Sequence, residues 1–474
     1  MFKVFASAIA LAVFTFSFQQ RPPVKDHSAH TTPRPAAVGW WVTTGDSSRL
    51  LHREHDLRTG NADSLSPSIN IQPAQQFQRM EGFGFALTDG SATLINRLPV
   101  EQRHALLREL FGKTEKSIGI SYLRISIGAS DLNASVFSYE DLPQGEKDPQ
   151  LEKFTLSQDT VDLVPVLKEI ISINPEIRLL GSPWSAPVWM KDNGNTVGGS
   201  LLKEYYPVYA EYFVKYLKAM ESYGIRLEAI TPQNEPLYGG NNPSMVMQAD
   251  DEKEFVRDHL GPALRSAGLK TKIIVYDHNC DRPDYPITIM NDSVAKSFVA
   301  GSAFHLYGGE ISALSTVHNA HPDRDIYFTE QWTGSKEPFA GNLAWHTKNV
   351  VIGTARNWGN AVIEWNLASD PQMNPHTTGG CSECKGAVTI GNDITRNVSY
   401  YIIGHVSKFV PPGSVRIAST EPVNLPNVAF LTPAGKIVII VENEKEHPVK
   451  VNLNFGRRTV TPELPGNSVA TFTL

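Results

Sequence analysis

Short apolar segments alternate with longer amphipathic segments through the middle of the chain, and this limits the possible folds more than any other feature. Segments with helical periodicity lie between most of the apolar ones, most clearly at residues 100–110, 159–173, 201–223, 251–267, 343–358 and 396–409. Eight apolar segments have the length and composition of strands: residues 82–87, 122–126, 178–181, 227–231, 272–276, 302–305, 325–329 and 361–365. Eight strands alternating with helices predict an α/β fold built on a (β/α)8 TIM barrel.

Two connections between the strands carry more detailed predictions. Ser157, Gln158 and Asp159 form a sequence typical of a helix N-cap, so we expect the second helix to begin there. The connection between the sixth and seventh strands is the weakest and leaves room for one short helix at best.

Both ends of the chain have the pattern of a β-sheet. Short strand-like segments precede the barrel at residues 39–44 and 68–72, and others follow it at 415–418, 428–431, 436–442, 449–453 and 468–474. Proline, glycine and asparagine separate them at intervals typical of a β-sandwich. We therefore predict N-terminal sandwich strands over 38–77, the catalytic barrel over 78–410, and the C-terminal sandwich over 411–474.

The N-terminus has the features of a signal peptide, predicted over residues 1–20. Lys3 supplies the positive charge, and the apolar run 6–18 is too short to span a hydrocarbon core of about 30 Å comfortably. A short membrane anchor is the alternative. Residues 21–37 are rich in Pro, His, Ser and Thr and indicate a flexible linker. We expect an exported protein, periplasmic or extracellular, with no stable membrane span in the mature chain.

Charge and motifs exclude several other classes of function. The chain has 49 acidic and 43 basic residues, a formal net charge of −6, and neither sign forms a long block. A nucleic-acid partner that depends on phosphate neutralisation is therefore not expected. The sequence lacks G-x-x-x-x-G-K-[ST], G-x-S-x-G and H-E-x-x-H. No cofactor and no metal site are implied.

Three cysteines remain for an exported chain, and two of them, Cys381 and Cys384, form a lone C-x-x-C between glycines. A structural zinc site needs further ligands, which do not follow in the sequence. An exported chain favours a local disulfide between Cys381 and Cys384, and two reduced thiols are the alternative. Cys280 is then unpaired.

Two glutamates follow predicted barrel strands and form a candidate catalytic pair. Glu235 follows the fourth strand in Pro-Gln-Asn-Glu-Pro, and Glu330 directly follows the seventh. The C-terminal ends of barrel strands form one rim, and two carboxyl groups across a pocket are what glycoside hydrolysis requires. The alternative is that each is a rim residue or a helix cap. Aromatic residues near other strand ends suit an apolar sugar face: Trp184, Tyr307, Trp332 and Trp365.

The ordered motifs along the barrel resemble the glucosylceramidase-like retaining β-glycosidases of glycoside hydrolase family thirty, and are closer to bacterial members. The resemblance covers roughly residues 78–414 and the flanking β elements. The motifs are Glu81-Gly82-Phe83-Gly84, Leu123-Arg124-Ile125-Ser126, Ser130-Asp131-Leu132, Ser182-Pro183-Trp184-Ser185-Ala186-Pro187, Gln233-Asn234-Glu235-Pro236, His305-Leu306-Tyr307, Thr329-Glu330 and Glu364-Trp365-Asn366-Leu367.

The resemblance implies a role for each matching residue. Glu235 corresponds to the acid/base, which starts protonated, and Glu330 to the nucleophile, which is ionised. Positions that hold the sugar in the cleavage subsite correspond to Asp131, Trp184, Asn234 and Trp365. Positions that orient and tune the carboxylates correspond to Arg124, His305 and Tyr307. The family fold, a barrel joined to a sandwich from both chain ends, agrees with the pattern of strands.

The expected function is that of a glucosylceramidase-like retaining β-glycoside hydrolase, which releases β-linked glucose through a covalent glycosyl-enzyme. Its substrate would be an oligosaccharide, a glucan or a glucosyl lipid of sphingolipid metabolism. The stretch 370–393 follows the eighth strand and looks more like bacterial relatives, some of which cut β-1,6-glucan. A β-1,6-glucanase or a gentiobiose-type β-glucosidase is therefore the alternative. A non-catalytic carbohydrate-binding protein is a remote one, because both carboxylates are present.

Overall fold

The computed structural model describes Met1 and residues 37–474. The predicted signal peptide and linker lie outside the described residues, except for Met1 and Ala37. Among the described helices, none is both long enough and apolar enough to cross a membrane.

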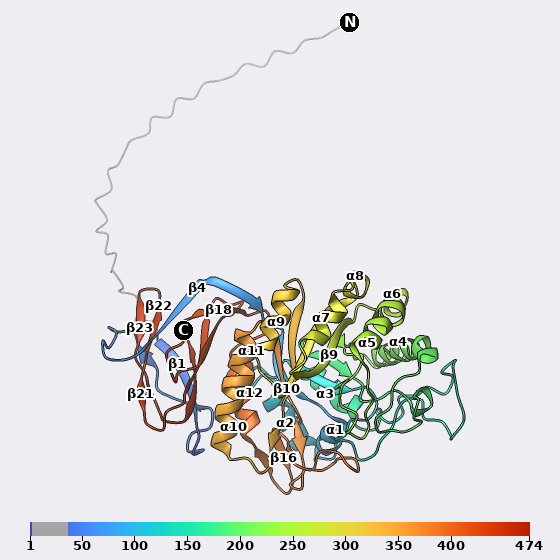
Figure 1. Ribbon diagram of the computed structural model, residues 1–474. Helices are drawn as coiled ribbons and strands as arrows, with labels where there is room; N and C mark the ends of the chain where they lie inside the picture. Colours follow the sequence, from blue (N-terminus) through green and yellow to red (C-terminus); the bar gives the residue numbers. More distant parts are fainter. Residues whose placement is uncertain (2–36) are drawn as a thin grey trace. The chain divides into compact units, whose positions relative to one another are not determined.

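Eight parallel strands close into a barrel, which confirms the predicted TIM barrel (Figure 1). Each predicted strand segment overlaps one of them. Side chains from seven of the strands form a separate buried cluster that includes Tyr122, Leu180, Ile274 and Tyr327, as expected for a filled barrel interior. The strands are β5 (Gly82–Ala86), β6 (Tyr122–Ser126), β7 (Arg178–Ser182), β8 (Ala229–Ile230), β9 (Lys272–Cys280), β10 (Val299–Gly309), β11 (Asp325–Glu330) and β13 (Gly359–Glu364).

Helices pack around the barrel and connect its strands. The helical segments expected at 251–267 and 343–358 are each continuous, but a wider π-helical turn occupies the middle of each. Between the sixth and seventh strands the structure has one short helix, α9, as expected. The helices are α1 (Asp89–Asn96), α2 (Val100–Phe111), α3 (Leu163–Ile173), α4 (Tyr206–Ser222), α5 (Ala249–Glu254), η3 (Phe255–Leu260), α6 (Gly261–Ser266), α7 (Asp284–Met290), α8 (Ser293–Lys296), α9 (Ala313–Ala320), α10 (Phe339–Trp345), η4 (His346–Ile352), α11 (Gly353–Arg356) and α12 (Val398–Ser407).

The N-cap expected at residues 157–159 is wrong. Helix α3 begins at Leu163, after a further turn of chain. Asp159 is buried, and its carboxylate accepts a hydrogen bond of 2.6 Å from the hydroxyl of Tyr139. This side chain therefore makes a tertiary contact instead of capping a helix.

Strands from both ends of the chain build one ten-stranded sheet, which confirms the predicted β-sandwich domain from two chain ends. Strand β1 pairs with β25, and β4 lies between β18 and β22. A second buried core, which includes Trp40, Ile69, Ile439 and Phe472, packs on this sheet. Its strands are β1 (Ala37–Thr44), β2 (His52–Arg53), β3 (Leu57–Arg58), β4 (Ser68–Arg79), β18 (Val415–Ser419), β19 (Asn427–Leu431), β20 (Ile437–Asn443), β22 (Asn452–Phe455), β23 (Arg458–Val460) and β25 (Ser468–Thr473).

Helix α12 joins the sheet to the barrel. It contacts β5 of the barrel and β25 of the sheet. The buried ring of His405 lies 2.8 Å from the hydroxyl of Thr471 through Nδ1 and 2.8 Å from that of Thr43 through Nε2. Burial lowers the pKa of His405 to about 3, so the ring is neutral at this junction.

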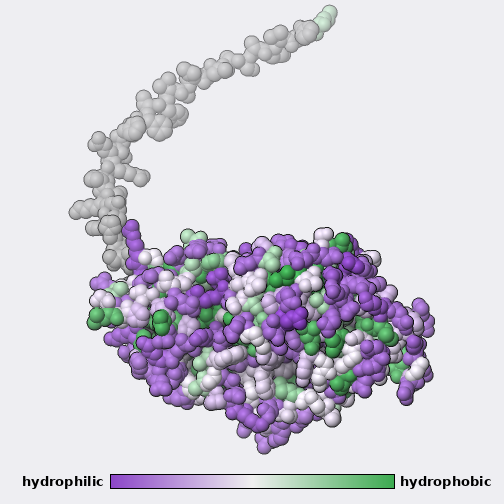
Figure 2. Space-filling model, viewed as in Figure 1, coloured by the Kyte–Doolittle hydropathy of each residue, from purple (hydrophilic) through white to green (hydrophobic). Residues whose placement is uncertain are grey.

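The face shown in Figure 2 is mainly hydrophilic, with hydrophobic residues scattered over it.

Candidate active site

Two glutamates lie at the C-terminal end of the barrel strands and face one cavity. Glu330 is the last residue of β11, and Glu235 lies in the loop that follows β8. The cavity has a volume of about 430 Å³. It is lined by Asp131, Trp184, Glu235, Tyr238, Asn241, His278, Asn279, Tyr307, Glu330, Trp332, Trp365, Cys381 and Cys384.

A larger cavity lies at the other end of the barrel strands. Its volume is about 800 Å³, and its lining includes Ser121 and Arg178, which lie where β6 and β7 begin. Active sites of TIM barrels form at the C-terminal ends of the strands. The smaller cavity, which contains both glutamates, is therefore the candidate active site.

The two glutamates are close enough to act on opposite sides of one sugar bond without a water between them. One carboxylate oxygen of each and one ring nitrogen of His305 all lie within 4.8 Å of one another. Retaining glycosidases have a carboxyl separation of about 5–5.5 Å, whereas inverting enzymes need about 6.5–9.5 Å to place a water. The geometry therefore suits a nucleophile and an acid/base.

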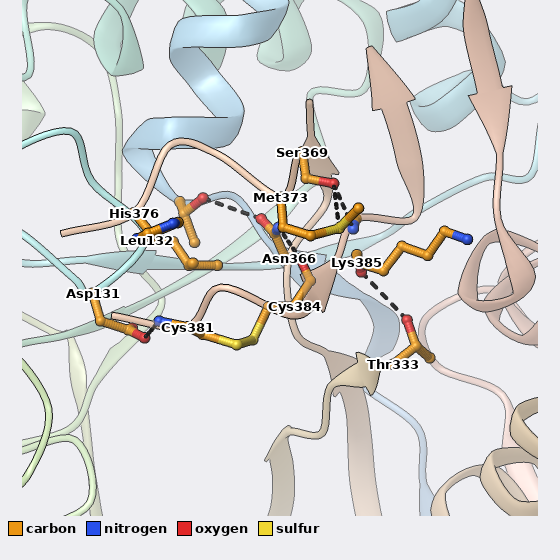
Figure 3. Close-up of a disulfide and its surroundings, with 12 residues drawn as sticks. Asp131, Leu132, Thr333, Asn366, Ser369, Met373, His376, Cys381, Cys384 and Lys385 are labelled. Carbon is orange, nitrogen blue, oxygen red and sulfur yellow. Dashed lines mark hydrogen bonds between the residues drawn. A yellow bond between two sulfur atoms is a disulfide. The ribbon is translucent and has the colours of Figure 1, made fainter. Parts of the chain in front are cut away.

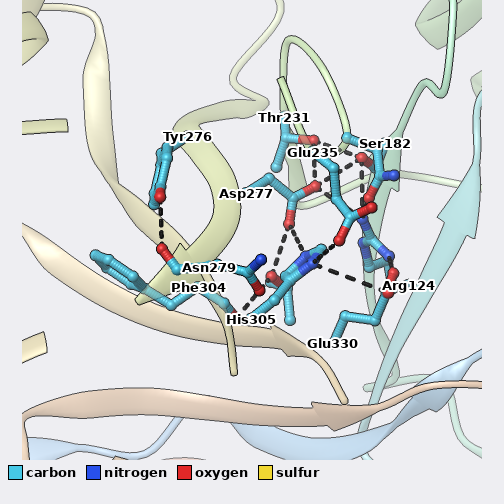
Figure 4. Close-up of polar contacts among 12 residues, drawn as sticks. Arg124, Ser182, Thr231, Glu235, Tyr276, Asp277, Asn279, Phe304, His305 and Glu330 are labelled. Carbon is cyan, nitrogen blue, oxygen red and sulfur yellow. Dashed lines mark hydrogen bonds and ion pairs between the residues drawn. The ribbon is translucent and has the colours of Figure 1, made fainter. Parts of the chain in front are cut away.

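Two donors orient the carboxylate of Glu330. The guanidinium of Arg124 donates from Nη1 to Oε2 at 2.6 Å, and the hydroxyl of Tyr307 donates to Oε1 at 3.0 Å. Arg124 also donates from Nη2 to Oδ1 of Asn234 at 2.5 Å. Arg124 is fully buried, so its charge acts with little screening by water. These bonds fix which face of Glu330 is turned to the cavity, and Figure 4 shows Arg124 beside Glu330.

Asp277, which the sequence analysis did not identify, holds the second layer of the site together. Its carboxylate accepts hydrogen bonds from Arg124 at 2.8 Å and from the Thr329 hydroxyl at 2.7 Å, and it lies 3.1 Å from Nε2 of His305. Burial would raise the pKa of Asp277, but Arg124 and His305 outweigh burial and hold it well below its usual range. A carboxylate directly after the predicted fifth strand, at 272–276, was the available signal.

His305 lies between the carboxylates and carries a positive charge. Its Nδ1 is 3.2 Å from Oε1 of Glu235 and 3.9 Å from Oε1 of Glu330, and Nε2 faces Asp277 (Figure 4). Burial lowers the pKa of His305, but the charge of Glu330 and the contacts with Asp277 and Glu235 outweigh it and raise the pKa to about 9. The ring is therefore an imidazolium at neutral pH.

The charges of this buried group favour a single ionised glutamate. Arg124 and His305 supply two positive charges and Asp277 supplies one negative charge. One ionised glutamate makes the group neutral, whereas two leave a net negative charge. Two carboxyls that share a site also resist double ionisation. The charge balance therefore favours one proton shared by Glu235 and Glu330, which is the state that an acid and a nucleophile need.

The pKa values of the two glutamates shift in the directions opposite to those that the roles implied by the resemblance require. Burial raises the pKa of Glu330 and outweighs the lowering effects of His305 and Arg124. Burial also acts on Glu235, but the hydrogen bond and the charge of His305, with smaller effects from other cations, lower its pKa overall. The physical reason is position, because Nδ1 of His305 lies nearer to Glu235 than to Glu330.

Strained backbone is concentrated at this rim. Glu235 has a backbone φ of 44° and Asp277 has a φ of 56°, values that residues other than glycine rarely adopt. Asn366, after the eighth barrel strand, has a φ of 29°. Such conformations cluster at functional sites, where the surrounding structure fixes them.

The structure divides the expected sugar-holding residues into two sets. Asp131, Trp184 and Trp365 line the cavity, and the two indole rings stack with centroids 5.5 Å apart. Asn234 is buried outside the cavity lining, and its side-chain carbonyl accepts a hydrogen bond from Arg124. The guanidinium of Arg124 lies 4.8 Å from the centre of the Trp184 ring and 5.8 Å from that of Trp365. These cation–π contacts help to hold both rings in place.

Four further residues of the cavity lining were not predicted as site residues: Tyr238, Asn241, His278 and Asn279. Asn241 donates to Oε2 of Glu235 at 3.3 Å, and Tyr238 is half exposed at the opening. Tyr238 and Asn241 lie in the loop after β8, whereas His278 and Asn279 lie at the end of β9, beyond the strand segment predicted at 272–276.

The structure joins Cys381 and Cys384 in a disulfide, and Cys280 is a free, buried cysteine (Figure 3). Both cysteines of the disulfide line the cavity. The disulfide packs in one apolar cluster with Trp184, Trp332 and Trp365. It is therefore part of the cavity wall.

Glu235, His305 and Glu330 are also the one group among the described residues whose ligand atoms converge closely enough to hold a metal ion. The imidazolium of His305 and the guanidinium of Arg124 already balance the carboxylates there. Added positive charge would be repelled, so these residues fit a carboxylate pair better than a metal site.

Comparison with known proteins gives the family. The glycosyl hydrolase family 30 TIM-barrel domain matches residues 80–410, and the glycosyl hydrolase family 30 beta sandwich domain matches residues 413–472. The chain belongs to glycoside hydrolase family 30. The family confirms the resemblance found in the sequence, and the protein is a glycosidase.

Relatives and solved structures support this over most of the chain. An endo-1,6-beta-D-glucanase of Neurospora crassa is 36% identical over 88% of this chain and 89% of its own. The lysosomal acid glucosylceramidase of Mus musculus is 29% identical over 81% of this chain and 79% of its own. A solved endo-β1,6-glucanase is 36% identical, with a TM-score of 0.86, over 92% of this chain and 99% of that one.

Proposed function

We propose that this family 30 glycosidase is a retaining hydrolase of β-1,6-linked glucan. The observation that carries the proposal is the identity of its relatives. Endo-1,6-β-glucanases match at 34–36% identity, whereas glucosylceramidases match at 27–29%. The difference in identity favours a β-1,6-glucanase, the alternative expected from the sequence, over a glucosylceramidase-like activity.

Glu330 would attack the anomeric carbon in the first step. Arg124 and Tyr307 hold its two carboxylate oxygens, so one face of the carboxylate is fixed toward the cavity. As the glycosidic bond breaks, Glu235 gives its proton to the leaving oxygen. The product is a glucosyl ester on Glu330 and a free hydroxyl on the leaving sugar.

The same two residues act in the second step, in which Glu235 serves as a base instead of an acid. Glu235, now ionised, removes a proton from a water molecule that attacks the anomeric carbon of the ester. The bond to Glu330 breaks, and the sugar leaves with its original β configuration. The 4.8 Å grouping of the two carboxylates and His305 supports this double displacement over a single inversion.

His305 can move the shared proton to the glutamate that needs it. Its Nδ1 proton passes to Glu235 across 3.2 Å, and a proton on Glu330 reaches Nδ1 through one bridging water, because the 3.9 Å between them exceeds hydrogen-bond reach. The net result is a protonated Glu235, an ionised Glu330 and an unchanged imidazolium. No net charge is created, which keeps the cost of this rearrangement low in a buried site.

The substrate of this protein can be tested directly. We expect hydrolysis of β-1,6-glucan and its oligosaccharides with a kcat/KM at least about tenfold above that for glucosylceramide, because a polar second sugar and an apolar lipid need different surfaces. Product analysis on β-1,6-glucan, gentiobiose and glucosylceramide measures this. Gentiobiose as the best substrate would indicate a β-glucosidase instead, and faster cleavage of glucosylceramide would contradict the proposal.

The stereochemistry provides an independent prediction. We expect the first-formed sugar to be the β anomer, because two displacements at one carbon restore its configuration. Proton NMR of the anomeric signal during the first minutes of hydrolysis measures it before mutarotation. An initial α anomer would show that a water molecule attacks directly, and would refute the assigned roles of Glu235 and Glu330.

The predicted signal peptide leads us to propose that the protein is exported. Mass spectrometry of the N-terminus of the mature protein would show whether cleavage occurs near residue 20.

A further inference from the structure

The loop that carries the disulfide joins several walls of the active-site cavity. It follows β13, and its short strand β15 (Cys384–Lys385) pairs with β12 (Thr333–Gly334), which directly follows Trp332. Ser335 donates from its backbone N–H to the carbonyl of Glu383 at 2.9 Å. The Cys384 end of the disulfide is therefore fixed to the chain that follows the nucleophile strand β11.

The Cys381 end of the disulfide touches a different wall. The backbone N–H of Cys381 donates to the carboxylate Oδ2 of Asp131 at 3.2 Å (Figure 3). Thr377, in the same loop, donates from its backbone N–H to the carbonyl of Asp131 at 2.8 Å. Asp131 lies after β6, is 6% exposed, and forms part of the cavity wall. The loop therefore holds both the main chain and the carboxylate of Asp131.

The packing between this loop and Asp131 leaves no spare space. A Cβ atom at Gly380 would lie 2.3 Å from the carbonyl oxygen of Asp131 and 2.8 Å from Oγ1 of Thr377. Only glycine allows the loop to approach this closely. A small shift of the loop would therefore move the Asp131 carboxylate relative to the two glutamates.

We infer that the Cys381–Cys384 disulfide is a positioning device for substrate binding, which fixes the Asp131 carboxylate against the sugar through the N–H of Cys381. The inference rests on the proposed function of the cavity as a sugar site. The mechanical path runs from β12 through β15 to Cys384, across the disulfide to Cys381, and by one hydrogen bond to Asp131. Breaking the disulfide frees Cys381 from β15 and leaves Thr377 as the loop's remaining contact with Asp131.

The inference predicts a loss of catalytic efficiency that depends on Asp131. We expect Cys381→Ser with Cys384→Ser to lower kcat/KM by about 10- to 100-fold, because displacement of a group that positions the substrate is costly even at 1 Å. In an Asp131→Asn background the same double change should lower kcat/KM by less than about threefold, since the positioned group is already altered. Hydrolysis of dinitrophenyl β-glucoside and of β-1,6-gluco-oligosaccharides measures both.

Three controls keep this double-mutant cycle specific. Glu383→Gln removes the exposed ion pair with Lys336 in the same loop and should leave kcat/KM within about twofold. Gly380→Ala keeps the disulfide but displaces the loop from Asp131, and should reproduce the loss. Alkylation of denatured, unreduced wild-type protein should label Cys280 alone, because the other two thiols are bonded.

The outcomes separate this inference from the proposed function. Equal losses in the two Asp131 backgrounds, or three labelled thiols in the wild type, would overturn the inference. A fully active double-serine variant would overturn it as well. Where turnover of Asp131→Asn is too slow to measure, the same four variants are compared in a Glu235→Gln background. Calorimetry then gives the affinity of each for the oligosaccharide in place of kcat/KM. Inactivity of the wild type toward β-1,6-glucan, with normal cleavage of the aryl glucoside, would refute the proposed linkage only.

Discussion

Glu330→Ala is expected to lower turnover at least about 10⁴-fold on every substrate, because no other group can form the glycosyl ester. A good leaving group should not restore activity, since it replaces the acid and not the nucleophile. Glu235→Ala should differ, with a loss of about 10²–10⁴-fold on β-1,6-glucan and a much smaller loss on dinitrophenyl β-glucoside, whose leaving group needs no proton. The measurement is kcat for each variant on both substrates.

Azide decides which glutamate has which role. In Glu235→Ala, azide should intercept the glycosyl ester on Glu330 and give a β-glycosyl azide. In Glu330→Ala, azide should occupy the space of the missing carboxylate and displace the leaving group directly, which gives an α-azide. This test matters because the structure lowers the pKa of Glu235 and raises that of Glu330. A β-azide from Glu330→Ala would show that Glu330 is the acid/base and Glu235 the nucleophile.

Replacing Arg124 with Met should be the most destabilising single change at the site. Arg124 is fully buried and pairs with the buried carboxylates of Asp277 and Glu330. Removing one partner of a buried ion pair leaves uncompensated charge, which costs about 3–5 kcal/mol in the free energy of unfolding. Urea unfolding measures the loss. Arg226→Met is the matched control, because its ion pair with Glu221 is exposed and the change should stay within about 0.5 kcal/mol.

The loss of stability in Arg124→Met should also depend on pH. In the wild type the folded pKa of Asp277 is low, so Asp277 stabilises the fold above its unfolded pKa and this contribution fades as pH falls. Without Arg124 we expect the pKa values of the buried carboxyls of Asp277 and Glu330 to rise. The variant should then be least stable at high pH, where these carboxyls must ionise. The difference between variant and wild type should therefore be larger at pH 8 than at pH 5. A pH-independent difference would show that lost packing, and not charge, is responsible.

Arg124→Lys separates charge from geometry at the same position. The ammonium keeps the positive charge but cannot bond at once to Glu330, Asp277 and Asn234 as the guanidinium does. We expect most of the stability to be retained and kcat to fall. Full activity in this variant would show that only the charge of Arg124 matters.

The sequence by itself determined the barrel, the two-ended sheet and the placement of the glutamates. Hydrophobic patterning is local, because it records which part of each segment is buried, and the barrel strands lie where the short apolar segments predict them. Glu235 and Glu330 were found because each follows a recognisable strand, and barrel strands all end at one rim. The N-cap expected at Ser157 failed because Asp159 makes a tertiary contact instead.

Only the tertiary structure decided how the charged groups of the site interact. Asp277, Arg124 and His305 come from three different strands, and their hydrogen bonds depend on the closure and register of the barrel, which no local pattern encodes. The position of His305, nearer to Glu235 than to Glu330, sets the order of their pKa values. The contact between Cys381 and Asp131 joins residues 250 positions apart. Such contacts form only when separate loops meet at one rim, because their energy depends on distances in space and not along the chain.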